Sequence, residues 1–327
     1  MKPQDSRTCA VCGTHLPVDR DLCPVCMFRE ALDEKDQSGL VAFSGQDQTE
    51  STARGLLGRF EHYEILKRAD GTPIELGRGA MGVTYKAFDI NLHCPVTLKV
   101  ISEQFLGDES ARLRFLREAR AAASVRHANV ASVLHLGRTG NRYFYAMEFV
   151  EGETLERFSR RSEGVEVKLA LEILAQVAAG LAAIHEQNLV HRDIKPSNIM
   201  VCLKGDGTLK AKIIDLGLAK SLNEPGEQTA ISTPGAFAGT PEFASPEQFA
   251  GVQVDIRSDL YSLGVVLWEM LTGQTPFRGT PGEVMYQHQR APLPLELLKA
   301  VPQPAVVLIE VLLEKDPTLR FQNRPNF

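Results

Sequence analysis

The chain has 327 residues, of which 43% are hydrophobic and 24% charged, and its formal net charge is -5. This length suits one large domain or two lobes, and the composition is that of a globular protein, not a low-complexity coil. The negative charge argues against a basic nucleic-acid-binding protein, so no nucleic-acid partner is expected.

Membrane and secretory signals are absent from the sequence pattern. The longest apolar stretch begins at Leu169, and Glu172 and Gln176 interrupt it before it reaches the length of a membrane span. We therefore expect a buried helix there and no membrane span within the chain. The N-terminus lacks the apolar core of a secretory signal, which favours a cytoplasmic location with reduced thiols.

Four cysteines lie close together at the N-terminus, as the pairs Cys9-x-x-Cys12 and Cys23-x-x-Cys26. Such pairs suit a tetrahedral zinc ion, which replaces the core that a short segment cannot build. We predict a zinc-ribbon-like module over residues 1–35, whose partner the sequence does not name. Redox dithiols or chance cysteines remain the alternative. Cys94 and Cys202 lie alone in apolar stretches, where buried structural thiols are expected.

Two further regions follow this module. Residues 36–58 are rich in Ser, Gly, Gln, Thr and Asp, which predicts a flexible linker. From residue 59 onward, short strand-like runs come first, one helix interrupts them, and helices dominate after Val150. A strand-rich part before a helix-rich part predicts an α+β domain over 59–327, with two lobes and a cleft between them.

The first cleft candidate is the segment LGRGAMGVTYKA, with Gly77, Gly79 and Gly82 between two strand-like runs. Glycines let backbone N–H groups approach phosphates, but a plain hairpin turn is an equally good explanation. Lys99 lies in the next apolar strand, where a lysine is costly unless it meets an anion. Glu118 is the candidate partner, and a surface pair between Glu118 and Arg114 explains the spacing equally well.

Two motifs further along decide between these explanations. HRDIKPSNIM spans His191 to Met200, and DLG begins at Asp215 after a predicted hairpin. Together with the glycine segment, VTLK, GTPEFASPEQ and DIRSDLYSLG, they resemble a protein kinase from Phe60 to Phe327. The sequence is most similar to the bacterial Ser/Thr kinases of eukaryotic type, which implies a bilobal kinase fold that transfers the ATP γ-phosphoryl group to protein hydroxyls, with autophosphorylation in signalling.

The resemblance implies a role for each motif residue. Asp193 would orient the substrate hydroxyl, Lys195 would offset charge on the phosphoryl group, and Lys99, held by Glu118, would grip the phosphates. Asn198 and Asp215 would bind Mg²⁺, with Mn²⁺ as a substitute. His191 is expected to pack beneath the loop. The implied ATP-binding residues are Leu76, Gly77, Gly79, Gly82, Thr84, Thr97, Lys99, Met147, Glu148, Val150 and Met200.

Other residues resemble the family's regulatory and structural positions. Arg192 would receive a phosphate from the activation segment, where Thr229, Ser232 and Thr233 are candidate donors, although a plain solvated loop is the alternative. Thr240 would contact the catalytic loop. Asp259 would brace that loop, and Glu247 and Arg320 would form a buried pair.

The sequence departs from the family at a few positions. Thr84 and Thr97 would add hydroxyls to the adenine pocket and so weaken nucleotide binding, whereas Leu216 can still fill an apolar slot. The chain ends at Phe327, soon after Arg320, so we expect it to lack the family's final helix and to be a fragment of a longer protein. The competing function is that of a pseudokinase scaffold, which the intact Lys99 and Asp193 argue against.

Overall fold

The computed structural model divides into two compact units, Met1–Arg54 and Gly55–Phe327. It describes strands β1 (Arg7–Thr8) and β2 (His15–Leu16) of the first unit and residues 58–79, 81–106, 109–161, 164–203, 205, 208–216, 240–252 and 254–322 of the second. The four N-terminal cysteines and all of the predicted linker except Gly58 lie outside the described residues. The module boundaries at 1–35 and 36–58 therefore stay predictions.

The first unit contains one short antiparallel pairing. β1 and β2 pair with Arg7 opposite Leu16 and Thr8 opposite His15. The segment between the two strands carries Cys9 and Cys12 in the sequence.

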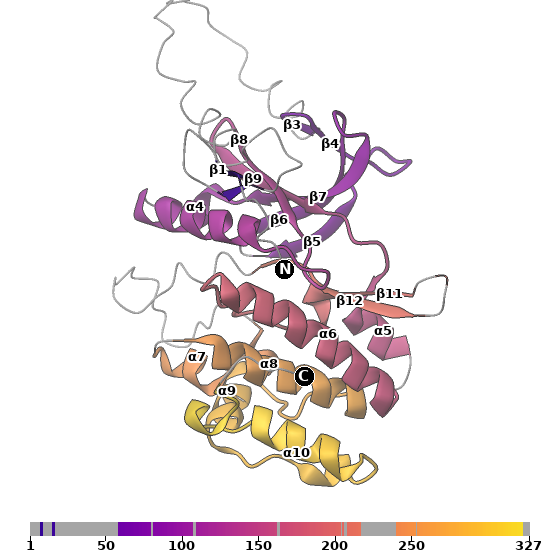
Figure 1. Ribbon diagram of the computed structural model, residues 1–327, viewed down its shortest axis with the longest axis vertical. Helices are drawn as coiled ribbons and strands as arrows, with labels where there is room; N and C mark the ends of the chain where they lie inside the picture. Colours follow the sequence, from indigo (N-terminus) through magenta and orange to yellow (C-terminus); the bar gives the residue numbers. More distant parts are fainter. Residues whose placement is uncertain are drawn as a thin grey trace, which may run out of the picture. The chain divides into compact units, whose positions relative to one another are not determined.

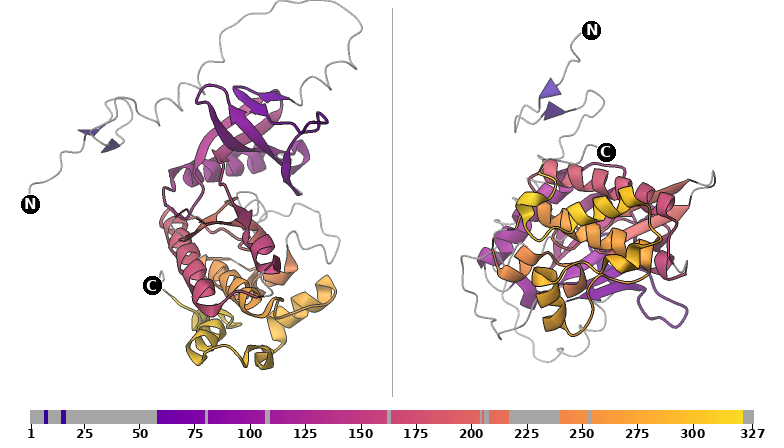
Figure 2. Two further views of the ribbon diagram at one scale, coloured as in Figure 1. Left: turned by 90° about the vertical axis from the view of Figure 1, so that its right-hand side faces the viewer. Right: turned by 90° about the horizontal axis from the view of Figure 1, so that it is seen from below.

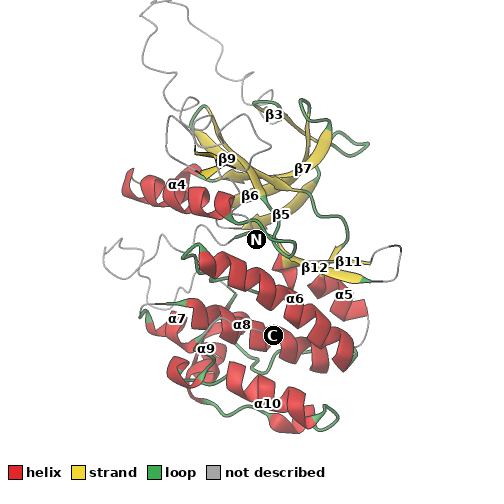
Figure 3. Ribbon diagram, viewed as in Figure 1, coloured by secondary structure: helices red, strands yellow, loops and turns green. Residues whose placement is uncertain are grey.

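The second unit begins with a seven-stranded antiparallel sheet, drawn in yellow in Figure 3, whose strands follow the order β3-β4-β6-β7-β9-β8 with β5 beside β6. Alternating burial along β6 and β7 gives this sheet an apolar face, as expected for strands with one covered side. Helix α4 (Glu109–Ser124) lies across the sheet in Figure 1. The strands are β3 (Arg59–Phe60), β4 (Tyr63–Ile65), β5 (Glu75–Gly79), β6 (Gly82–Asp89), β7 (Cys94–Ile101), β8 (Val133–Thr139) and β9 (Arg142–Glu148).

The rest of this unit is mainly helical, as the two views in Figure 2 show. Helix α8 carries the buried Trp268, begins at the N-cap Asp255 and ends at Gly273, whose φ of 72° suits glycine. The predicted strand-rich and helix-rich parts are therefore confirmed. The helices after α4 are α5 (Leu155–Arg161), α6 (Val167–Glu186), α7 (Pro246–Ala250), α8 (Ile256–Thr272), α9 (Pro281–Arg290) and α10 (Gln303–Leu312).

Helix α6 is the apolar stretch that the sequence predicted to be a buried helix. Among the described residues, it is the one helix long and apolar enough to cross a membrane by length and composition. Its residues Ile173, Val177 and Leu181 are buried in the hydrophobic core together with residues of α8. The described part of the chain therefore shows no clear membrane span.

A small sheet connects the helical part to the large sheet. β10 (Glu153–Thr154) pairs with β11 (Ile199–Leu203), and β11 forms an antiparallel hairpin with β12 (Leu209–Ile213). The segment that follows α4 docks onto β12, because the Ala131 N–H donates to the Ile213 carbonyl at 2.8 Å. In Figure 1 the hairpin lies between the helices and the large sheet.

Candidate active site

The hairpin β11–β12 brings two distant motifs together. Its register pairs Ile199 with Ile213, so Asn198 stands directly before the hairpin and Asp215 two residues after it. The Ile214 N–H donates to the Asn198 carbonyl at 2.9 Å and fixes this arrangement. The sequence predicted this hairpin, and its pairing explains how two separate motifs contribute to one site.

Asp193 lies inside a set of polar contacts made by its own loop. The Asn198 amide donates from Nδ2 to the Asp193 carbonyl at 2.8 Å and to Asp193 Oδ2 at 3.1 Å. Lys195 Nζ lies 3.1 Å from the same carboxylate and donates to Thr240 Oγ1 at 3.0 Å. The structure thus brings Lys195 and Thr240 into the contact expected from the sequence. The Asn198 nitrogen is used for positioning, which leaves its amide oxygen to face a cation.

Lys99 makes an ion pair that the sequence did not predict. Its Nζ lies 2.6 Å from Asp215 Oδ1 and 2.5 Å from Oδ2, and its side chain is almost fully buried. Glu118 is buried on α4. The expected Lys99–Glu118 pair stays a prediction. Both oxygens of Asp215 face the ammonium group, a contact that sequence spacing could not reveal because Asp215 is 116 positions away from Lys99.

Tyr145 adds a contact to the same carboxylate. It stands opposite Lys99 in the β7–β9 register and its hydroxyl donates to Asp215 Oδ1 at 3.0 Å. Burial, and then the charge of Asp215, raises the pKa of Tyr145 well above its ordinary value, so the hydroxyl stays a donor. The sequence analysis missed this residue. The alternation along β9, which places Tyr145 on the same strand face as Met147, was the available signal.

The residues expected to bind ATP come from five strands. Gly77 and Gly79 in β5 have open space where a Cβ would be, whereas a Cβ on Gly82 would lie 1.9 Å from the Val100 carbonyl oxygen. Only glycine fits at position 82, where φ is 148°. The register pairs Thr84 with Lys99 and Thr97 with Met147, and the other implied residues are Leu76 in β5, Glu148 in β9, Val150 just after β9, and Met200 in β11.

The catalytic loop rests on a buried carboxylate in α8. Asp259 accepts the backbone N–H groups of His191 and Arg192, each at 2.8 Å, and lies 2.8 Å from His185 Nε2. Burial alone would raise the pKa of Asp259, but the hydrogen bond and charge of His185 outweigh it and hold that pKa below its usual value. Arg192 and Asp215 both have φ near 63°, a strained conformation that such bracing sustains.

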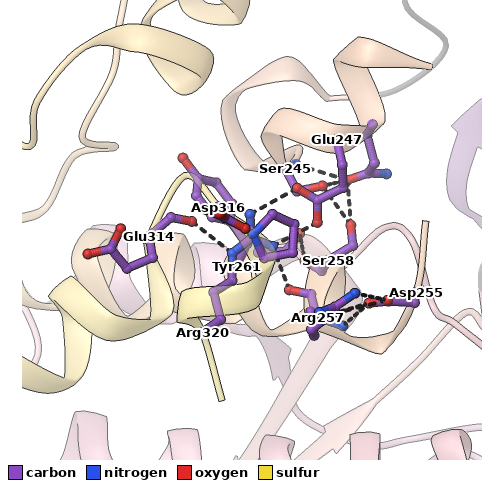
Figure 4. Close-up of polar contacts among 12 residues, drawn as sticks. Ser245, Glu247, Asp255, Arg257, Ser258, Tyr261, Glu314, Asp316 and Arg320 are labelled. Carbon is purple, nitrogen blue, oxygen red and sulfur yellow. Dashed lines mark hydrogen bonds and ion pairs between the residues drawn. The ribbon is translucent and has the colours of Figure 1, made fainter. Parts of the chain in front are cut away.

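A second brace is the ion pair between Glu247 on α7 and Arg320 near the C-terminus, drawn in Figure 4. The guanidinium donates from Nη1 to Oε1 at 2.7 Å and from Nη2 to Oε2 at 2.9 Å, and both residues are buried. The predicted buried pair is present. Leu216 is also buried in the core, as expected of an apolar replacement. Thr229, Ser232 and Thr233 lie outside the described residues.

The chemistry of this site fits ATP and a magnesium ion. Asn198 and Asp215 offer an amide and a carboxylate oxygen, the hard ligands that Mg²⁺ prefers. Lys99 supplies a buried positive charge, and the open space beside Gly77 and Gly79 gives phosphates access to the backbone.

Comparisons with known proteins agree with this geometry. Residues 73–324 match the protein kinase domain. The serine/threonine-protein kinase pkn2 of Myxococcus xanthus is 39% identical over 254 residues, which cover 76% of this chain and 30% of that protein. The serine/threonine-protein kinase PknB of Mycobacterium leprae is 38% identical over 256 residues, which cover 76% of this chain and 40% of that protein.

A solved structure supports the same fold. The crystal structure of Rad53 1-466 in complex with AMP-PNP aligns with a TM-score of 0.65 and 25% identity, covering 80% of this chain and 62% of that one. The chain spans less than half the length of the two kinases named above. The domain match, the relatives and the arrangement of Lys99, Asp193, Asn198 and Asp215 together show that this chain belongs to the protein kinase family.

Proposed function

We propose that this chain is a serine/threonine protein kinase that transfers the ATP γ-phosphoryl group to protein hydroxyls with the help of Mg²⁺. One observation carries this proposal. The hairpin β11–β12 brings the Asn198 amide, which donates to Asp193, towards the ion pair between Lys99 and Asp215. Lys195, two residues after Asp193 and bonded to Thr240, supports the serine/threonine type.

Each residue acts mainly through position and charge, which is what phosphoryl transfer requires. Asp193 accepts or orients the hydroxyl proton of the substrate, while Lys195, 3.1 Å from its carboxylate, offsets charge on the transferring group. Asn198 and Asp215 would hold the metal ion, which would offset the negative charge of the phosphates. Lys99 binds the phosphates, which requires it to share or leave its contact with Asp215.

The test is a phosphotransfer assay with the whole chain. Incubated with ATP and Mg²⁺, it should phosphorylate itself or a generic peptide on serine or threonine, and removal of Mg²⁺ by a chelator should abolish the transfer. Nucleotide binding without any transfer would instead favour the scaffold function.

We also propose that phosphorylation of the activation segment raises this activity. The support for this role of Arg192 is its place in the catalytic loop beside Asp193, where its backbone N–H donates to Asp259. A phosphate on Thr229, Ser232 or Thr233 carries nearly two negative charges and would pair with the guanidinium and order the segment. Mass spectrometry after incubation with ATP should find phosphate there, and full activity in a variant with all three residues changed to alanine would contradict the proposal.

The N-terminal cysteines form the second part of the proposed function, a structural zinc site. The β1–β2 pairing supports it, because paired strands on either side of Cys9 and Cys12 suit a metal-binding turn. The free energy of zinc binding at such sites is favourable by roughly 10 kcal/mol or more. Elemental analysis should show that a Cys9→Ser, Cys23→Ser variant loses about one zinc ion per chain relative to the wild type, with phosphotransfer to a free peptide unchanged. A Cys9–Cys12 disulfide without metal would favour the redox alternative.

A further inference from the structure

A cluster of metal-ligand side chains lies in the large sheet, outside the kinase motifs. Glu61, His62 and His135 each place one ligand atom within 4.8 Å of the others. Glu61 and His62 form the turn between β3 and β4, whereas His135 belongs to β8. β3 and β8 stand at opposite ends of the strand order, so the sheet curls until its two ends meet at this cluster.

Direct contacts confirm that the two ends meet. The imidazoles of His62 and His135 stack with centroids 5.5 Å apart and an angle of 24° between the planes. The Arg138 N–H of β8 donates to Glu61 Oε1 at 3.3 Å. A group bound here would therefore contact both ends of the sheet at once.

The carboxylates beside the imidazoles are fixed in place. Asp89 is buried, and its Oδ1 accepts the N–H groups of Asn91 and Leu92 at 2.9 and 3.0 Å, while Oδ2 lies 3.5 Å from His62 Nε2. A Cβ on Gly137 would lie 2.7 Å from Glu61 Oε1, so the glycine leaves the room that this carboxylate occupies. Ligands held in this way need little reorganisation to bind an ion.

The side chains of Glu61 and His135 lie close together but are not hydrogen-bonded to each other. Glu61 Oε2 and His135 Nε2 are 3.7 Å apart, too long for a hydrogen bond. Arg59 Nε donates to the Glu61 backbone carbonyl, and the Arg138 guanidinium donates to Gly140 and Asn141. Among the described residues, the ion-pair partners of the Asp89 and Glu61 carboxylates are the imidazoles of His62 and His135.

We propose that Glu61, His62 and His135 bind one divalent transition-metal ion, with zinc as the preferred ion and Asp89 as the carboxylate that orients His62. Two imidazoles and one carboxylate match the ligands of zinc, and a carboxylate beside a ligating histidine is the usual supporting partner. The fourth position is open to water, because the cluster is only partly buried. The ion joins the β3–β4 turn to β8 and stabilises the curled sheet, independently of the proposed kinase activity.

The test uses the whole chain with Cys9→Ser and Cys23→Ser, so that the N-terminal cysteines do not add to the count. Titration with zinc alone should give about one site per chain, and Co²⁺ should give an absorption spectrum without thiolate charge-transfer bands. Adding His62→Asn and His135→Gln should weaken zinc binding by at least about 100-fold. His93→Asn, which changes an exposed histidine in the β6–β7 turn, should leave it unchanged.

Glu61→Gln is a second test that does not depend on whether the double histidine variant folds. The substitution keeps the size of a partly exposed side chain and should therefore leave the fold unchanged. It should weaken zinc binding by about tenfold or more while leaving the circular dichroism spectrum and phosphotransfer unchanged. Two results would overturn the proposal. One is fewer than about 0.2 zinc ions per chain at saturating zinc, and the other is a zinc affinity of the Glu61 and histidine variants equal to that of the chain with only the cysteine substitutions. Neither result bears on the kinase activity, which the phosphotransfer assay measures separately.

Discussion

Replacing Asp193 by asparagine is expected to lower kcat by roughly 10² to 10⁴, the range for loss of a positioned acid–base group. Asparagine keeps the size of the side chain and an oxygen that can accept from the Asn198 amide, now 3.1 Å away. It removes the negative charge that accepts or orients the substrate proton. Because no contact to Lys99 or to the glycine strand changes, the affinity for ATP should stay within about twofold.

The measurement is steady-state phosphotransfer to a peptide, combined with nucleotide binding by calorimetry. Asp70→Asn is the matched control, because it makes the same chemical change at an exposed turn where the carboxylate only accepts from Thr72. That control should retain wild-type kcat. An Asp193→Asn variant with kcat within threefold of wild type would mean that the proposed catalytic loop does not perform the reaction.

The sequence predicted most of this site, because kinase motifs combine residue type with fixed local spacing. Asp193, Lys195 and Asn198 lie on one short loop, so their closeness follows from the chain itself. Asp215 required one further step, the hairpin β11–β12, which short strands and a glycine-containing turn also indicated. The braces at Asp259 and Glu247 followed from the resemblance alone, since no spacing rule connects them to their partners.

The features that sequence reasoning missed depend on contacts between distant strands. Lys99 pairs with Asp215, which is 116 positions away in the chain. Tyr145 joins them only because β9 pairs with β7 in one particular register. The cluster at Glu61, His62 and His135 forms only when the sheet curls until β3 and β8 meet. Periodicity along one strand carries no information on such closure.

Removal of the Glu247 side chain should have the largest effect on stability, because it leaves a buried charge without its counterion. Arg320 uses every N–H of its guanidinium, donating to both Glu247 oxygens and to the backbone carbonyls of Arg257, Glu314 and Lys315. Its guanidinium also lies over the Tyr261 ring, with 4.8 Å between its carbon and the ring centroid (Figure 4). The pair thereby ties α7, α8 and the last turn of the chain together.

Glu247→Ala should therefore lower the free energy of unfolding by about 3–5 kcal/mol, since two N–H groups and the positive charge of Arg320 would stay buried without partners. Arg257→Ala is the control in the same neighbourhood, because its pair with Asp255 is partly exposed and should contribute at most about 1 kcal/mol. Denaturant unfolding can be followed through Trp268, the 1 tryptophan in the sequence, which lies buried in α8. If both variants unfold at the same denaturant concentration, the buried pair does not stabilise the helical part as its geometry indicates. If instead Glu247→Ala unfolds first and Glu247→Gln recovers part of the difference, the charge and the lost hydrogen bonds contribute separately, because glutamine restores one acceptor without the charge.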